Sequence, residues 1–301
     1  MSLAILDERL LAATPLPALS GTGGKEDRGS VLVVAGGGAV PGAPVLTGLG
    51  ALRSGAGKLQ MVATRATAVP LGIAVPESLI LWGPQTGDRE IGLPSRTRLA
   101  AYARGADAVV IGPGMMGERI ARAFTAGLLA LFPHLPAVVD AAALPSAKAE
   151  GRFPELAAVR TVLTPHAGEM AGMLALTKEE VLTDPLGMAR EAAARFQSVI
   201  VMKGPTTFVS SPSGLVWRHD GGVTGLGTSG SGDVLAGVIG GLLARGAPPL
   251  EAALWGVYVH AVAGRRLAQE IGPIGFIASD LLAAIPRVLA ETSGAASPGG
   301  A

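Results

Sequence analysis

The chain has 301 residues, of which 49% are hydrophobic and 16% are charged, and its formal net charge is +1. Because lysine and arginine form no dense block, neither a nucleic acid nor a membrane surface is an expected partner. The sequence contains no cysteine, which excludes disulfides, thiolate metal sites and cysteine nucleophiles, and its apolar stretches are interrupted within 18 residues, so we expect a soluble, cytoplasmic enzyme.

Short runs rich in valine, isoleucine and leucine alternate with longer alanine- and leucine-rich segments. Strands are predicted at 31–35, 59–63, 107–111, 137–140, 160–163, 198–202, 206–210 and 215–218. Helices are predicted at 43–54, 117–131, 231–245, 250–269 and 278–291. Continuous apolar strands between helices are typical of an α/β fold in which helices cover both faces of a mostly parallel sheet.

The last two predicted strands, TTFVSS and GLVWRH, are joined around Pro212, Ser213 and Gly214. This spacing predicts a β-hairpin added to the sheet. We expect a single domain over residues 1–301, because no linker or change of composition divides the chain. Its ends, about 1–25 and 293–301, are predicted to be poorly ordered.

The first glycine cluster, VLVVAGGGAVPGAP, lies between a predicted strand and a predicted helix. A dinucleotide-binding fingerprint fails here, because Pro41 takes the third glycine position and no acid follows about 20 residues later. A Walker A loop fails as well, because GALRSGAGK lacks the required glycine and lysine spacing. The cluster predicts a strand-to-helix turn that needs positive φ, and a close approach to a ligand stays open.

The second glycine cluster, GTSGSGDVLAGVIGGLLARG, leads into a helix that begins near Ser231. Glycines expose backbone N–H groups, and the first helical turn adds unpaired N–H groups and the positive end of the helix dipole. Together they predict an anion site. Asp233 lies beside it, where a carboxylate can accept the proton of a substrate hydroxyl during phosphoryl transfer. The alternative is a flexible turn in which Asp233 only begins the helix.

Seven segments, in this order, resemble the ADP/ATP-dependent NAD(P)H-hydrate dehydratases of the ribokinase-like superfamily. They are GAPVLTGLGALRSGAG (42–57), VVIGPGM (109–115), VVDAAAL (138–144), LTPHAGE (163–169), VMKGPTTFV (201–209), GLGTSGSGDVLAG (225–237) and HAVAGRRLA (260–268). The resemblance implies a ribokinase-like three-layer α/β/α fold and a nucleotide-repair reaction. ADP, or ATP, phosphorylates the hydroxyl of hydrated NADH or NADPH, and elimination of phosphate restores NAD(P)H. Mg²⁺ and a homo-oligomer, with a tetramer suspected, are also implied.

The resemblance assigns roles to residues in these segments. Asp233 would deprotonate the substrate hydroxyl, and Glu169 would orient Mg²⁺ through water. The anion hole would be formed by Gly230, Ser231 and Gly232. The nucleotide would be bound by Lys203, Gly204, Pro205, Thr206, Thr207 and Gly232. The hydrated substrate would contact Ala43, Gly114, His166 and Asp233.

Four of the polar residues also have simpler interpretations. Lys203 can be a solvated strand end, and His166 can be a helix-start cap or a core residue. His260 lies on an apolar helix and is interpreted as a packing residue. Asp140 ends a predicted parallel strand, where open α/β sheets bind ligands, but it can instead form hydrogen bonds to loops.

The chain departs from the family pattern at three places. Ala142 replaces the second acid of a DADAL pattern, Val223 and Thr224 stand where an asparagine is usual, and GPGMMG has one residue more than GPGMG. Two alternative functions stay open. One is a small-molecule kinase of the same superfamily, which would release a phosphorylated product. The other is a nucleotide-binding regulatory module without catalysis. LTPHAGE and KGPTT favour the dehydratase.

Overall fold

The computed structural model describes residues 3–18, 23–147 and 160–294. Its centre is a ten-stranded sheet in which every neighbouring pair is parallel except the two pairs that involve β9. In order across the sheet the strands are β1 (Leu3–Ile5), β10 (Val216–His219), β9 (Thr207–Ser210), β8 (Val199–Met202), β7 (Thr161–Leu163), β6 (Ala137–Val139), β5 (Ala108–Ile111), β2 (Ser30–Val34), β3 (Lys58–Ala63) and β4 (Ser78–Trp82).

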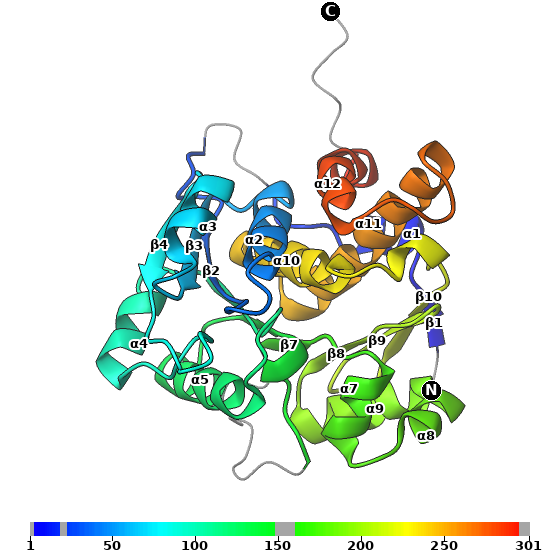
Figure 1. Cartoon of the computed structure of the whole chain (residues 1–301). Coiled ribbons are helices and arrows are strands. Elements are labelled where there is room, and N and C mark those ends of the chain that lie inside the picture. Colours follow the sequence, from blue (N-terminus) through cyan, green and yellow to red (C-terminus); the bar gives the residue numbers. More distant parts are fainter. Residues whose placement is uncertain (1–2, 19–22, 148–159, 295–301) are drawn as a thin grey trace, which may run out of the picture.

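Helices cover both faces of this sheet, which gives three layers (Figure 1). One face carries α1 (Glu8–Ala13), α2 (Ala43–Arg53), α3 (Ala68–Ala74), α10 (Ser231–Ala244), α11 (Pro249–Glu270) and α12 (Ala278–Thr292). The other carries α4 (Arg96–Ala103), α5 (Glu118–Leu131), α7 (Ala167–Leu174), α8 (Lys178–Thr183) and α9 (Pro185–Phe196). The expected mostly parallel sheet between helical layers is confirmed.

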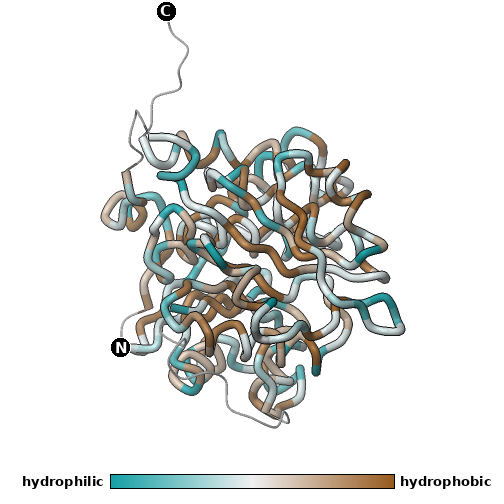
Figure 2. Tube along the Cα trace, turned by 90° about the vertical axis from the view of Figure 1, so that its left-hand side faces the viewer, coloured by the Kyte–Doolittle hydropathy of each residue, from teal (hydrophilic) through white to brown (hydrophobic). Residues whose placement is uncertain are grey.

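The two cores follow from the alternation of side chains along each strand. In β2, Val31 and Val33 belong to one core, whereas Leu32 and Val34 belong to the other. Strands buried on both faces must be apolar at every position, which is why they read as continuous Val/Ile/Leu runs. In Figure 2 the brown, apolar segments run through the middle of the molecule. None of the described helices combines the length and apolar composition that a bilayer crossing requires.

All eight predicted strands and five predicted helices are present, with ends within one residue of the prediction. The hairpin is also confirmed, because β9 and β10 pair antiparallel. The elements β4, α3, α4 and α7 to α9 were not predicted, because their periodicity is weaker or their length is short.

The prediction that about 1–25 is poorly ordered is wrong for the segment that contains β1 and α1. β1 pairs in parallel with β10, which lies more than 200 residues away in the sequence. The indole Nε1 of Trp255 donates to the Thr14 carbonyl (2.8 Å), and the Tyr258 hydroxyl donates to Glu8 (2.9 Å). A three-residue strand has no local pattern of its own, so its order depends on these distant partners. At the other end, residues 295–301 lie outside the described residues.

Helices α2 and α10 cross in close contact because glycines line their interface. A Cβ at Gly237 would lie 2.1 Å from the Thr47 carbonyl oxygen, and one at Gly50 would lie 2.8 Å from the Val234 carbonyl oxygen. Both partners are backbone atoms, which cannot rotate away. The crossing therefore fixes the N-terminus of α10 relative to α2.

We predict that Gly237→Ala destabilises the protein by about 1–3 kcal/mol, because its methyl group would force the two helices apart. The matched control is Gly172→Ala in α7, where an added Cβ meets nothing within 4 Å. That change should stabilise the protein by about 0.5–1 kcal/mol, because alanine favours the helix. Urea denaturation of both variants measures the two effects. Equal effects of the same sign would contradict the close crossing.

Candidate active site

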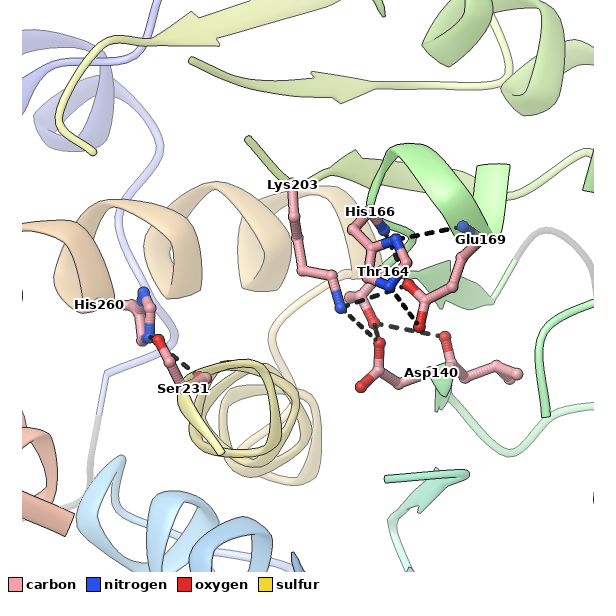
Figure 3. Close-up of polar contacts among 8 residues, drawn as sticks. Asp140, Thr164, His166, Glu169, Lys203, Ser231 and His260 are labelled. Atoms are coloured by element: carbon pink, nitrogen blue, oxygen red, sulfur yellow. Dashed lines mark hydrogen bonds and ion pairs between the residues drawn. The ribbon is translucent and has the colours of Figure 1, made fainter. Parts of the chain in front are cut away.

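The predicted polar residues meet at one edge of the sheet, where neighbouring parallel strands end. Asp140 follows β6, Thr164 follows β7 and Lys203 follows β8. Because β6, β7 and β8 are adjacent and parallel, their carboxyl ends lie side by side. The Lys203 N–H also donates to the Pro165 carbonyl (2.8 Å), which fastens the two strand ends together. Figure 3 shows these side chains pointing toward one another.

Asp140 and Lys203 form a largely buried ion pair. The Oδ1 of Asp140 accepts from the Lys203 ammonium (2.8 Å) and from the Thr164 hydroxyl (2.7 Å), and only 3% of the residue is exposed. Of the two interpretations of Asp140, the structure therefore shows the internal hydrogen bonds. Lys203 is not a solvated strand end, because its side chain is only 20% exposed.

The Lys203 ammonium also faces two further carboxylates. Its Nζ lies 3.7 Å from Oε2 of Glu169, and Asp233 on α10 acts on it through space. Burial opposes the charge of Lys203, but the charges of Asp140, Glu169 and Asp233 outweigh this effect and raise its pKa. Lys203 is therefore a permanent cation in this site.

Asp233 is the third residue of α10 and is largely buried. Burial raises the pKa of its carboxyl to about 7, the charge of Asp140 adds to this rise, and the charge of Lys203 opposes it. An ordinary aspartate is fully ionised at neutral pH, whereas this one is poised between its two forms. A group that titrates near the working pH can both take up and release a proton, as a general base must.

The start of α10 offers backbone donors next to the Lys203 ammonium. Gly230 is the N-cap with φ +87°, a conformation that favours glycine. Within the described parts of the chain, the N–H groups of Gly230, Gly232 and Asp233 have no acceptor. A Cβ on Gly232 would lie 3.5 Å from the Lys203 Nζ, so the ammonium faces this turn. Unpaired N–H groups and a cation together favour an anion.

Ser231 differs from its two neighbours in the predicted anion hole. Its N–H donates to the Thr228 carbonyl (3.3 Å), and only 4% of the residue is exposed. Its hydroxyl and carbonyl oxygens each lie 3.1 Å from Nε2 of His260. His260, interpreted from the sequence as a packing residue, thus makes a specific polar contact as well. No local signal shows this pair, because the two residues lie on different helices.

The KGPTT loop, residues 203–207, connects β8 to β9. Gly204 and Pro205 are exposed, whereas Thr206 donates its hydroxyl proton to Asp220 (2.9 Å). Arg218 binds the same Asp220 oxygen (2.8 Å). The loop is thus held from the β10 side, and its first residues stay open to a ligand.

His166 is the N-cap of α7, which is the helix-start interpretation given above. The ring Nδ1 of His166 accepts from the backbone N–H of Glu169 (3.1 Å), and the backbone N–H of His166 donates to Oε2 of Glu169 (2.8 Å). The His166 side chain is 58% exposed. The cap uses Nδ1, and Nε2 lies 3.5 Å from Oε1 of Glu169, while much of the ring stays exposed. A role in substrate binding stays a prediction.

Ala43 and Gly114, both predicted to contact the hydrated substrate, lie against each other. Gly114 has φ +66°, and a Cβ there would lie 2.4 Å from the Ala43 Cβ. Ala43 is buried, so its side chain serves this packing, and the substrate role of both residues stays a prediction. Of the two methionines in GPGMMG, Met115 is buried and Met116 is exposed.

The first glycine cluster forms the predicted turn with positive φ, since Gly36 has φ +68°. Gly37 and Gly38 lie against residues of another loop: added Cβ atoms would meet the Glu90 carboxylate and the Arg89 side chain. The Ala39 N–H donates to Glu90 (3.2 Å). The close approach that these glycines permit is therefore made by the chain itself.

A direct metal site is absent from the described part of the chain, where no three Asp, Glu or His side chains are arranged to bind an ion. Glu169 already accepts one backbone N–H and lies near Lys203. The residues present therefore fit Mg²⁺ only as an ion bound mainly by nucleotide phosphates, with Glu169 acting through water.

Comparison with known proteins finds relatives over most of the chain. The ADP-dependent (S)-NAD(P)H-hydrate dehydratase of Xanthomonas campestris pv. campestris is 45% identical over 285 residues, which cover 93% of each chain. The chain also matches the bifunctional NAD(P)H-hydrate repair enzyme of Moorella thermoacetica at 34% identity, but it spans only 54% of that protein.

Solved structures show the same fold. The ADP/ATP-dependent NAD(P)H-hydrate dehydratase from Bacillus subtilis, co-crystallised with ATP and Mg²⁺, superposes with a TM-score of 0.81 at 28% identity, over 97% of this chain and 99% of that one. A ribokinase-like superfamily protein from Enterococcus faecalis superposes with a TM-score of 0.78 over 97% of this chain and 96% of that one; at 23% identity this likeness concerns the fold alone. Residues 31–287 match the NAD(P)H-hydrate dehydratase family. The chain therefore belongs to the NAD(P)H-hydrate dehydratase family.

Proposed function

We propose that this protein is an NAD(P)H-hydrate dehydratase that uses ADP, or ATP, as its phosphoryl donor. The observation that carries the proposal is the arrangement at the start of α10. A carboxyl with a pKa of about 7, unpaired N–H groups and a permanent ammonium lie together at the carboxyl edge of the sheet. Phosphoryl transfer needs a base for the attacking hydroxyl and positive charge around the migrating group, and this site offers both.

In the first step the ionised Asp233 takes the proton of the substrate hydroxyl. The hydroxyl oxygen forms a bond to the terminal phosphorus of the nucleotide while the bond from that phosphorus to its bridging oxygen breaks. AMP leaves when ADP is the donor, and ADP leaves when ATP is the donor. The N–H groups of Gly230 and Gly232 and the Lys203 ammonium stabilise the charge on the migrating phosphoryl group.

In the second step the carbon–oxygen bond breaks and phosphate leaves with the bonding electrons. The lone pair of the ring nitrogen compensates the electron-poor carbon, and loss of a proton from the neighbouring ring carbon restores the double bond. Hydroxide would be a poor leaving group here, whereas phosphate is a good one. A kinase-like site can therefore catalyse a dehydration.

The remaining assignments are part of the proposal. Mg²⁺ would be bound by the nucleotide phosphates, with Glu169 orienting its water ligands, and would supply positive charge to the phosphates. The exposed start of the KGPTT loop would bind the nucleotide, and Ala43, Gly114 and His166 would line the site of the hydrated ring. The homo-oligomer, the tetramer and the cytoplasmic location stay predictions.

We predict that Asp233→Asn lowers turnover by about 10²–10⁴-fold, because it removes the base. The affinity for ADP should change less than about threefold, because the N–H groups are kept. Absorbance of the reduced nicotinamide and phosphate release, with NADH hydrate, ADP and Mg²⁺, measure turnover, and calorimetry measures binding. Equal losses of binding and turnover would argue against this role.

The same assay separates the two alternatives. Recovery of NADH with free phosphate is expected of a dehydratase. A phosphoester that accumulates without NADH would instead identify a small-molecule kinase. ADP binding without any product would identify a regulatory module that binds the nucleotide but lacks catalysis.

We predict that Asp233 makes the unliganded protein less stable as pH rises. Its pKa is about 7 in the folded state against an ordinary 3.8, so the stabilising effect of the protonated form is complete below pH 3.8 and is lost as pH rises through 7. Asp233→Asn cannot ionise, so its stability advantage should grow between pH 4 and pH 8, by about 2–4 kcal/mol. Thermal melts across this range measure it. A difference independent of pH would count against a buried, titrating carboxyl.

We predict that Asp140→Asn shifts the acid limb of the kcat/KM profile to lower pH. The negative charge of Asp140 raises the pKa of Asp233, and its removal also leaves Lys203 free to favour the ionised form. The side-chain oxygen of asparagine can still accept the hydrogen bond from the Thr164 hydroxyl, so the segment after β6 should keep its position. The control is Glu179→Gln, an exposed carboxylate on α8, which should leave the profile unchanged. A shift to higher pH would refute the coupling.

A further inference from the structure

His260 and Ser231 form a buried polar contact behind the first turn of α10. His260 lies in the interior of α11 and is 8% exposed, and Ser231 is the first residue of α10. Nε2 of His260 lies 3.1 Å from both the hydroxyl oxygen and the carbonyl oxygen of Ser231. Figure 3 shows this pair apart from the cluster around Asp140 and Lys203.

The carbonyl oxygen fixes the direction of these hydrogen bonds. A carbonyl can only accept, so the His260 Nε2 must carry a proton and donate. The same N–H also reaches the Ser231 hydroxyl oxygen, which then accepts. Burial lowers the pKa of His260 to about 4, the Ser231 carbonyl opposes this effect, and the Lys203 charge adds to it. The ring is therefore neutral near pH 7 and donates through Nε2 there.

Ser231 is turned inward through all its polar atoms. Its N–H donates to Thr228, and its carbonyl and hydroxyl oxygens accept from His260. The neighbouring N–H groups of Gly230, Gly232 and Asp233 have no such partners among the described residues. Ser231 thus divides the turn into an anchored inner side and an open outer side.

We propose that His260 is a positioning residue, which anchors the first turn of α10 through Ser231. Ser231 is then an internal anchor and not a donor to the phosphoryl group, and the open N–H groups of Gly230, Gly232 and Asp233 bind it instead. This proposal rests on the proposed function for its kinetic consequences. A turn that shifts by a fraction of an ångström would misplace both the donors and the Asp233 carboxylate, and such errors are felt mainly in the transition state.

The test compares His260→Leu, which removes the donor and keeps an apolar side chain, with His260→Gln, whose amide nitrogen can donate from a similar distance. We expect His260→Leu to lower kcat about tenfold, the loss that one buried hydrogen bond accounts for. KM for ADP should change less than about threefold, and His260→Gln should recover most of kcat. The acid limb of the His260→Gln profile should stay near pH 7, because Asp233, not His260, titrates there. Wild-type kcat in His260→Leu would overturn the proposal.

A double-mutant cycle tests whether His260 acts through Ser231. If it does, Ser231→Ala combined with His260→Leu should be no slower than His260→Leu alone, because His260→Leu already removes the hydroxyl contact that Ser231→Ala removes, as well as the contact to the Ser231 carbonyl. Effects that multiply would overturn this route. The matched control is Trp255→Phe, which removes another hydrogen bond of α11, the partly buried one to Thr14. It should lower stability without lowering kcat.

Hydrogen exchange keeps this proposal separate from the proposed function. Amide exchange of Ser231 and Val234, the hydrogen-bonded N–H groups of this turn, should be faster in His260→Leu than in the wild type, and close to the wild type in His260→Gln. This measurement needs no substrate. A wild-type protein without dehydratase activity would refute the proposed function only, whereas unchanged exchange in His260→Leu would refute the anchor.

Discussion

The site depends on one cation shared by three carboxylates. Lys203 is bonded to Asp140, lies near Glu169 and acts on Asp233, and each of these acids comes from a different element. One positive charge cannot balance three negative charges in a largely buried site. The ionised form is therefore disfavoured at the carboxyl that has no direct hydrogen-bond partner. That carboxyl is Asp233, and its burial, together with the charge of Asp140, raises its pKa to about 7, which leaves it able to exchange a proton near neutral pH.

The fold imposes this arrangement through two rigid constraints. Adjacent parallel strands carry Asp140, Thr164 and Lys203 to the same edge, at a spacing set by the sheet. The glycine-lined crossing of α2 and α10 fixes the position of the first turn of α10, which carries Asp233. Neither constraint involves a ligand, so the unpaired N–H groups and the Asp233 carboxyl are held in place without any nucleotide. Such preorganisation is how a site stabilises charge that develops only in the transition state.

Function and stability oppose each other at this edge. A glycine-rich turn before α10 exposes N–H groups that an ordinary cap would satisfy, and the burial of Asp233 disfavours its ionised form. The surrounding structure compensates by packing the rest of α10 between the sheet, α2 and α11. The His260 contact to Ser231 belongs to the same supporting structure, because it restrains the turn from the side away from Lys203.

The sequence by itself determined what depends on local pattern. Runs of apolar residues predicted eight strands and the hairpin, the apolar stripe predicted α10, and the glycines around Asp233 predicted exposed N–H groups. The tertiary structure alone decided which distant groups meet. Asp140 and Lys203 are 63 residues apart and Ser231 and His260 are 29 apart, and the β1 strand needs β10 to exist. Periodicity and capping act within one element, whereas contacts between elements depend on strand register and helix crossing, which no short stretch of sequence encodes.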